Sequence, residues 1–232
     1  MKIGQPIVHF LTIDSTQDEA KRHLKGVYWT TDQTSGRGRF DRKWYSEPGK
    51  SLAVSIALPE YKDFPKPFLI SIWICLGLAE AFDLKVQWPN DLVVNRKKVC
   101  GILTEIIDGV PVVGIGLNVG KMMFPEDLSL RASSLANEDH LHITTNQAFE
   151  KLMMAIERLP AVPAAWEAIE EKWRLYDDTD GKVFRLHDGR VGIAEGISDA
   201  GELIWNGRGE YEIVTFAEAL WGPEPQGELE GV

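Results

Sequence analysis

Several features are scarce in this chain of 232 residues, and each shortage excludes a class of protein. The only cysteines are Cys75 and Cys100, which excludes a disulfide-stabilised scaffold and a cysteine-rich metal site. The most apolar stretch, residues 68–79, is shorter than the ~20 residues that a membrane-spanning helix needs. Basic residues number 25 against 35 acidic ones, so a general nucleic-acid-binding surface is not expected. No secretory signal is visible, and a cytoplasmic protein is expected.

The scarce positive charge is concentrated in residues 32–44, which read Asp-Gln-Thr-Ser-Gly-Arg-Gly-Arg-Phe-Asp-Arg-Lys-Trp. Gly36 and Gly38 carry no Cβ, so the backbone there can approach a ligand closely. The arginines of the segment supply guanidinium groups, which suit carboxylate and phosphate oxygens. Trp44 offers a flat face on which a base can stack. The pattern indicates a loop that closes over an anionic, nucleotide-bearing ligand, with a solvated turn or an RNA-binding segment as the alternatives.

A second group of motifs starts at residues 88–91, Trp-Pro-Asn-Asp, between two predicted strands. Proline fixes the backbone of this turn, so the polar pair after it projects from a rigid site. Lys98 and Gly101 follow in the next strand. Gly114 and Gly116 stand two residues apart in another strand, hence on one face, and strand glycines often mark a ligand lying against the backbone. Taken alone, each motif also fits a tight turn or a packing glycine.

The order of predicted elements indicates how the chain is organised. Strands and helices follow one another without strict β-α-β alternation, which favours a mixed β-sheet with helices packed on one face. After residue 181 the chain becomes a run of short strands with glycine turns, typical of a small barrel or sandwich. We expect a larger domain over residues 1–178, a small β domain over residues 179–221, and a disordered tail over residues 222–232.

Together these motifs resemble those of the biotin–protein ligase family, in the form that lacks an N-terminal DNA-binding domain. The shared motifs are, in chain order, Asp14-Ser15-Thr16-Gln17, Gly36-Arg37-Gly38-Arg39 with Arg42 and Trp44, Trp88-Pro89-Asn90-Asp91, Gly101-Ile102-Leu103 and Gly114-Ile115-Gly116-Leu117-Asn118-Val119. The resemblance covers residues 8–120 and extends to the small C-terminal β domain. It implies an α+β fold, in which a class II synthetase-like biotin–lipoate ligase domain is followed by an SH3-like β-barrel. We expect no winged helix before Val8, and hence no operator binding.

The resemblance also implies an ATP-dependent, AMP-forming ligase. Such an enzyme converts biotin and Mg-ATP to biotinyl-5′-AMP, then transfers biotin to one lysine of a biotin carboxyl carrier protein. Biotin, ATP and Mg²⁺ are therefore the expected small molecules, and the carrier domain is the expected partner. Neither nucleic acid nor a membrane is expected as a partner. The exposed edge strands of this fold also allow a homodimer.

By the same resemblance, the expected site residues fall into sets that share a role. The catalytic set is Arg39, Lys98 and Asp91. The biotin set is Ser15, Thr16, Gln17, Gln33, Arg37, Gly38, Arg39, Lys98, Gly101, Gly114 and Gly116. The nucleotide set is Arg39, Arg42, Trp44, Asn90, Lys98 and Asn118, and no dedicated metal-ligand cluster is expected. The residue types suit the chemistry, because a carboxylate that attacks a phosphate needs fixed cations against the repulsion, and a closed loop excludes water.

Two departures from the family pattern leave alternatives open. Gln87 stands where the family usually has lysine, and residues 215–221 replace the usual Gly-Glu-containing, Arg-ending strand. The alternatives are a lipoate or octanoate ligase or transferase, which shares the fold, and a non-catalytic biotin-binding regulator. The glycine and charge content of residues 36–45 predicts disorder there without ligand. The sequence identifies neither the oligomeric state nor the carrier.

Overall fold

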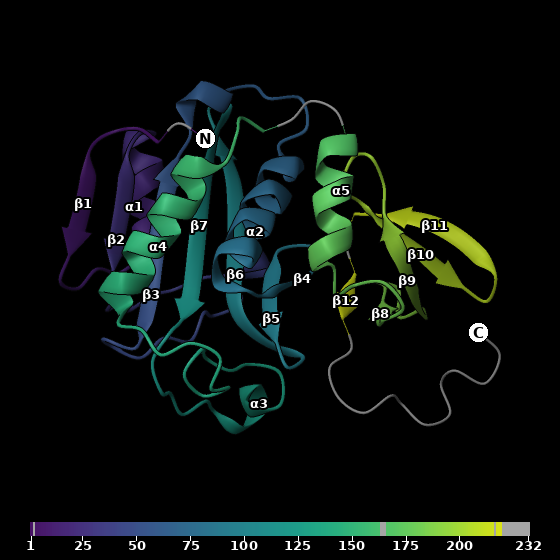
Figure 1. The fold of residues 1–232 in the computed structure, drawn as a ribbon. Coiled ribbons are helices and arrows are strands. Elements are labelled where there is room, and N and C mark those ends of the chain that lie inside the picture. The colour runs from purple at the N-terminus through teal and green to yellow at the C-terminus, as the bar shows by residue number, and fades with distance from the viewer. Residues whose placement is uncertain (2, 163–165, 216, 220–232) are drawn as a thin grey trace.

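The computed structural model describes residues 1, 3–162, 166–215 and 217–219. The predicted disordered tail, residues 222–232, lies outside this range. Within it, no helix is both long and apolar enough to cross a membrane. Figure 1 shows a large sheet with helices laid over it, beside a smaller sheet formed by the C-terminal part of the chain. This arrangement confirms the predicted mixed sheet with helices and a small second β-sheet, although the helices are not all on one face.

Among the described residues, seven strands form the large sheet in the order β1-β2-β3-β7-β6-β5-β4. The strands are β1 (Ile7–Phe10), β2 (Val27–Thr30), β3 (Ser51–Ala57), β4 (Lys85–Gln87), β5 (Asp91–Val94), β6 (Lys97–Ile107) and β7 (Val110–Asn118). Only the β1–β2 pair is parallel among these strands, and the others run antiparallel. The long central strands β3, β7 and β6 therefore lie side by side, which brings residues far apart in the sequence into register.

The two faces of this sheet differ because side chains alternate along each strand. On one face Val54, Ile56, Ile102 and Ile115 are buried in the main hydrophobic core. On the other face the register places small residues in rows, with Ala53 opposite Gly116 and Gly116 opposite Gly101, then Ser55 opposite Gly114. A row of small residues leaves open volume above the sheet.

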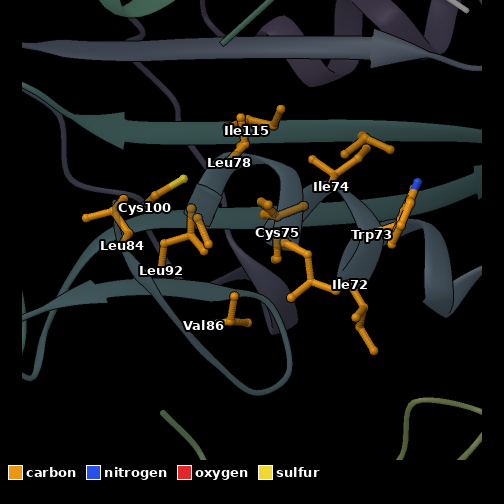
Figure 2. Close-up of a cluster of buried hydrophobic side chains, with 14 of the residues drawn as sticks. Ile72, Trp73, Ile74, Cys75, Leu78, Leu84, Val86, Leu92, Cys100 and Ile115 are labelled. Carbon is orange, nitrogen blue, oxygen red and sulfur yellow. The ribbon is translucent and has the colours of Figure 1, made fainter. Parts of the chain in front are cut away.

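Helices cover the apolar face. They are α2 (Phe68–Phe82), α4 (Thr145–Arg158) and α5 (Glu167–Tyr176). Helix α2 is apolar on nearly all sides because it lies between the sheet and the outer helices, and Figure 2 shows its side chains among those of the strands. The short helix α1 (Thr16–His23) lies on the other face, where Ala20 packs with Tyr28, Ala57 and Val112. The short helical turns η1 (Arg39–Asp41), η2 (Pro59–Tyr61) and α3 (Glu126–Ser129) lie in the connections.

The C-terminal part of the chain forms the second sheet, in the order β11-β10-β9-β8-β12 among the described residues. Its antiparallel strands are β8 (Val183–Arg185), β9 (Val191–Ile197), β10 (Leu203–Gly207), β11 (Glu210–Val214) and β12 (Glu218–Ala219). A small antiparallel sheet of this kind fits an SH3-like domain.

Trp88 connects the two sheets. Its backbone N–H donates to Thr179 Oγ1 at 2.8 Å, and its indole N–H donates to the Gly201 carbonyl at 2.9 Å. The indole also meets the Phe184 ring edge-on, with centroids 6.2 Å apart. The turn that follows Trp88 is therefore held from behind by the second sheet.

Candidate functional site

The site is a cavity of about 310 Å³ above the small-residue face of the large sheet. The backbone of the strands forms its floor. Glycine is required at two positions of this floor, because a side chain there would collide with neighbouring side chains. A Cβ on Gly116 would lie 2.5 Å from the Trp44 indole, and a Cβ on Gly101 would lie 3.0 Å from both Trp44 and Lys98. The indole therefore lies directly on the strands, in the space that a side chain at position 116 or 101 would fill. The paired strand glycines predicted a ligand against the backbone here; Trp44 occupies part of that space, and the ligand contact stays a prediction.

Helix α1 supplies a polar end to the cavity. Ser15 caps the helix by accepting from the Asp18 N–H, which places the next residues at the cavity wall. Thr16 donates from its backbone N–H to Gln33 Oε1 at 2.9 Å, and its hydroxyl lies 2.9 Å from Ser55 Oγ. Ser15, Thr16 and Ser55 are all buried. The Thr16 and Ser55 hydroxyls pair with each other, whereas the Ser15 hydroxyl accepts from the Asp18 N–H.

The glycine–arginine segment, residues 36–44, folds into a short flap over the cavity. Arg37 and Lys43 form an antiparallel bridge, the Gly38 N–H donates to the Arg42 carbonyl at 2.8 Å, and the Trp44 N–H donates to the Gly36 carbonyl at 2.9 Å. The segment thus has its own backbone hydrogen bonds. Its order in the absence of ligand stays a prediction.

An ion pair ties this flap to helix α1. The Arg37 guanidinium donates to both carboxylate oxygens of Asp18, at 2.6 and 2.8 Å. Hydrogen bonding to Arg37 lowers the pKa of Asp18 to about 2. Since the two side chains are only partly exposed, the pair persists at neutral pH and positions the base of the flap. Arg37 thus engages a carboxylate of the protein itself while it also lines the cavity, and its contact with biotin stays a prediction.

The opposite end of the cavity is cationic. Lys98 Nζ lies 2.6 Å from Asp91 Oδ1 and 5.5 Å from the centre of the Trp44 ring. Burial lowers the pKa of Arg39, while Asp91 opposes this effect and Arg42 adds to it. Asn90 donates from its side chain to the Ile102 carbonyl, which fixes the turn against β6. The positive charge is therefore held in place before any ligand arrives.

Gln87, which stands where the family pattern has lysine, has a cation beside it. Gln87 is 2% exposed and lines the cavity, and its Oε1 lies 3.5 Å from Nζ of Lys182. Lys182 comes from the C-terminal part of the chain and also pairs with Asp178. The position where the family pattern has lysine is thus polar here, with an ammonium group beside it.

Every residue predicted for the site lines this one cavity. Sequence reasoning missed part of the lining. The missed residues include Ser55, Phe124, Leu128, Arg131, Ala132 and Ala217. A signal existed for Ser55, because it alternates with apolar residues in β3, but only the register places it beside Gly114. The segment after β7 contains no recognisable motif, so the sequence did not point to it. In the structure it contacts Tyr45 of the cavity lining, whose hydroxyl donates to the Met123 carbonyl at 3.0 Å.

The fold and the cavity define a class of α+β proteins in which a cationic flap covers a glycine floor beside a buried hydroxyl cluster. Residues 11–121 match the model of the biotin/lipoate A/B protein ligase family. This part of the chain is therefore a domain of the biotin/lipoate A/B protein ligase family.

Relatives and solved structures agree with this assignment. The bifunctional ligase/repressor BirA of Bacillus subtilis (strain 168) is 28% identical over 227 residues, which cover 87% of this chain and 70% of that protein. The biotin–[acetyl-CoA-carboxylase] ligase of Paracoccus denitrificans is 27% identical over 234 residues, covering 90% of this chain and 98% of that protein. The structure of biotin protein ligase from Aquifex aeolicus in complex with biotin and ATP is similar, with a TM-score of 0.79 at 24% identity, covering 94% of this chain and 100% of that one. At this identity the structural likeness establishes the fold.

Proposed function

We propose that this chain is an ATP-dependent biotin–protein ligase, which forms biotinyl-5′-AMP and transfers biotin to a lysine of a biotin carboxyl carrier protein. The observation that carries the proposal is the gathering of all the predicted biotin and nucleotide residues around one cavity. The relatives named for this activity support it, and one of them matches over nearly its whole length.

In the first step, a biotin carboxylate oxygen attacks the α-phosphorus of ATP, the bond to the β-phosphate breaks, and pyrophosphate leaves. The repulsion between two anions is the obstacle, and Arg39 and Lys98 are the cations that we assign to overcome it. Both are fixed near Asp91, so little reorganisation is needed when the charge develops. We assign the hydroxyls of Ser15 and Thr16 to the ureido ring of biotin, because they pair with both carbonyl and N–H groups.

The nucleotide lies against Trp44, Arg42, Asn90 and Asn118 in this proposal. Bound Mg²⁺ neutralises phosphate charge and commonly takes one or two protein oxygens together with the phosphates. The donor set fits this ion, because Asp91 supplies a carboxylate and Asn118 Oδ1 is buried with no hydrogen-bond partner in the described part of the chain. The flap then excludes water, which protects the mixed anhydride from hydrolysis.

In the second step, the ε-amine of the carrier lysine attacks the acyl carbon, and AMP leaves. Asp91 is the only carboxylate among the described residues that line the cavity, and we assign it to steer the incoming amine. The open edge of the large sheet at β1, where Ile7 is exposed, is the edge at which we place a homodimer contact. Because Cys75 and Cys100 are both free and buried, we place the enzyme in the reducing cytoplasm.

Biotin-dependent pyrophosphate release with Mg-ATP tests the proposal, beside an identical assay with lipoate. Release with biotin alone is the expected result, and Arg39→Ala and Lys98→Ala are expected to slow it by roughly 10²–10³-fold with biotin still bound. Release with lipoate alone would reassign the chain to the lipoate branch of the family. Biotin binding without pyrophosphate release would favour a non-catalytic regulator and make Gln87 the position to test first.

A further inference from the structure

Gln17, the second residue of α1, has an orientation that its neighbours determine. Its Nε2 donates to Glu105 Oε2 at 3.0 Å and to the Val112 carbonyl at 3.0 Å. Both partners are acceptors, so the end of the amide that faces them must carry the NH₂ group. The amide oxygen therefore points the other way, and it is buried with no hydrogen-bond partner within the part of the chain that the structure describes.

That oxygen lies next to Gly114, on the small-residue face of the sheet that forms the cavity floor. A Cβ on Gly114 would lie only 2.7 Å from Gln17 Oε1 and 3.6 Å from Ser55 Oγ. Ser55 in turn contacts the Thr16 hydroxyl at 2.9 Å, and both Gln17 and Ser55 line the cavity. An acceptor without a partner thus stands beside the hydroxyl group that we assign to the ureido ring. A buried acceptor of this kind calls for a donor from the ligand.

Glu105 lies behind Gln17 and outside the cavity lining, and it is fixed from two sides. Its Oε2 accepts from Gln17, while its Oε1 accepts from Lys21 Nζ at 2.9 Å. Lys21 lies 3.4 Å from Asp18, the carboxylate that holds the flap through Arg37. With both oxygens engaged, the Glu105 carboxylate has little freedom, and neither does the amide that it holds.

We propose that Glu105 is a positioning residue that keeps the Gln17 oxygen toward the cavity, and that this oxygen accepts a hydrogen bond from an N–H group of the substrate. The inference rests on the proposed function, since the ureido ring of biotin carries two N–H groups at the end away from its carboxylate. The dithiolane ring of lipoate and the hydrocarbon chain of octanoate carry none, so either would leave the acceptor buried and unpaired. The Gln17–Glu105 pair then selects biotin over the other acyl substrates of the family.

Isothermal titration with biotin and with each of its two mono-N-methylated ureido derivatives tests the inference without relying on catalysis. In the wild type we expect one derivative to bind roughly 10- to 100-fold more weakly than biotin, because its methyl group replaces the donated proton. In Gln17→Met this ratio is expected to fall to about 3 or less, because methionine has no amide acceptor. In Glu105→Leu the ratio is expected to fall at least about threefold, and Glu105→Gln, whose amide oxygen still accepts, is expected to restore it.

Glu19→Gln is the matched control, because it removes the same charge from the outer side of α1, where Glu19 pairs with Arg22. Its ratio should equal that of the wild type, and thermal unfolding shows whether each variant is folded. A ratio unchanged in both Gln17→Met and Glu105→Leu would overturn the inference while leaving biotin binding intact. A wild-type protein that binds no biotin and releases no pyrophosphate would instead overturn the proposed function, and the inference with it.

Discussion

At the scale of single residues, the site consists largely of side chains that hold other side chains. Asp18 illustrates this, since its carboxylate binds the guanidinium of Arg37 and its neighbour Lys21. Neither contact needs a ligand, and both set where the flap begins. A charged group used in this way contributes to folding stability, and that contribution depends on pH in a direction that the pKa shift fixes.

The pKa of Asp18 falls from 3.8 to about 2 through Arg37. A lowered pKa means that the stabilisation is fully present above 3.8 and is lost as the pH falls toward 2. Asp18→Asn should therefore lower the free energy of unfolding at pH 7 by about 1–2 kcal/mol, after allowance for partial exposure. About half of that difference should disappear by pH 3. Urea unfolding of both proteins between pH 3 and pH 7 measures it.

The comparison has a control on the same helix. Glu19→Gln removes an exposed pair with Arg22 and should change the free energy of unfolding by a few tenths of a kcal/mol at most, about the size of a surface pair. A difference between wild type and Asp18→Asn that stays constant down to pH 3 would mean that the ionised pair is not its source.

At the scale of elements, the flap over residues 36–44 is a connection that lies outside the strands of the large sheet. Its short hairpin is closed by backbone hydrogen bonds from Gly38 and Trp44, and Phe40 at its tip is 63% exposed with a left-handed φ of 57°. Its contact with the sheet is made through Trp44 on Gly116 and Gly101. Such a segment opens locally at low cost in free energy, whereas the strands beneath it open only with the whole domain.

Limited proteolysis tests this difference. Trypsin should cut the unliganded protein first within the flap, which offers several arginines and one lysine. Biotin with Mg-ATP should slow that cut by about tenfold or more, because ligand and flap order each other. Trp44→Ala should speed the cut without ligand. First cleavage at Arg208, in the β10–β11 turn, or a flap cut at the same rate with ligands, would contradict the prediction.

At the scale of the whole molecule, the sequence predicted the residues that belong to local motifs better than those that strand pairing brings to the cavity or behind its wall. Glycine spacing within β7 places Gly114 and Gly116 on one face, because alternation along a strand is a local property. Ser55 and Glu105 could not be found in this way, since their roles depend on which strands pair and in what register. The side of the sheet on which α1 lies was equally hidden, because it depends on packing of Ala20 against three strands.

The junction between the two sheets also lay beyond sequence reasoning, and it bears on the predicted domain boundary. Phe184, Leu203 and Trp205 of the second sheet belong to the same hydrophobic core cluster as the α2 side chains. Gly201 approaches α2 so closely that a Cβ there would lie 2.6 Å from Ile72. A continuous core of this kind predicts that the two parts unfold together, even though their sequences look like separate domains.

Differential scanning calorimetry should therefore show one transition, with equal calorimetric and van't Hoff enthalpies. Trp88→Phe removes the indole donor to the Gly201 carbonyl and leaves a small cavity, at a cost of about 1–3 kcal/mol. The single transition should shift down by several degrees and stay undivided, since each kcal/mol moves Tm by roughly 2–4 °C at this size. Tyr211→Ser, on an exposed strand position, should leave it in place. Two resolved transitions in the wild type would show instead that the sheets fold independently, and that the turn after Trp88 is held by the large sheet alone.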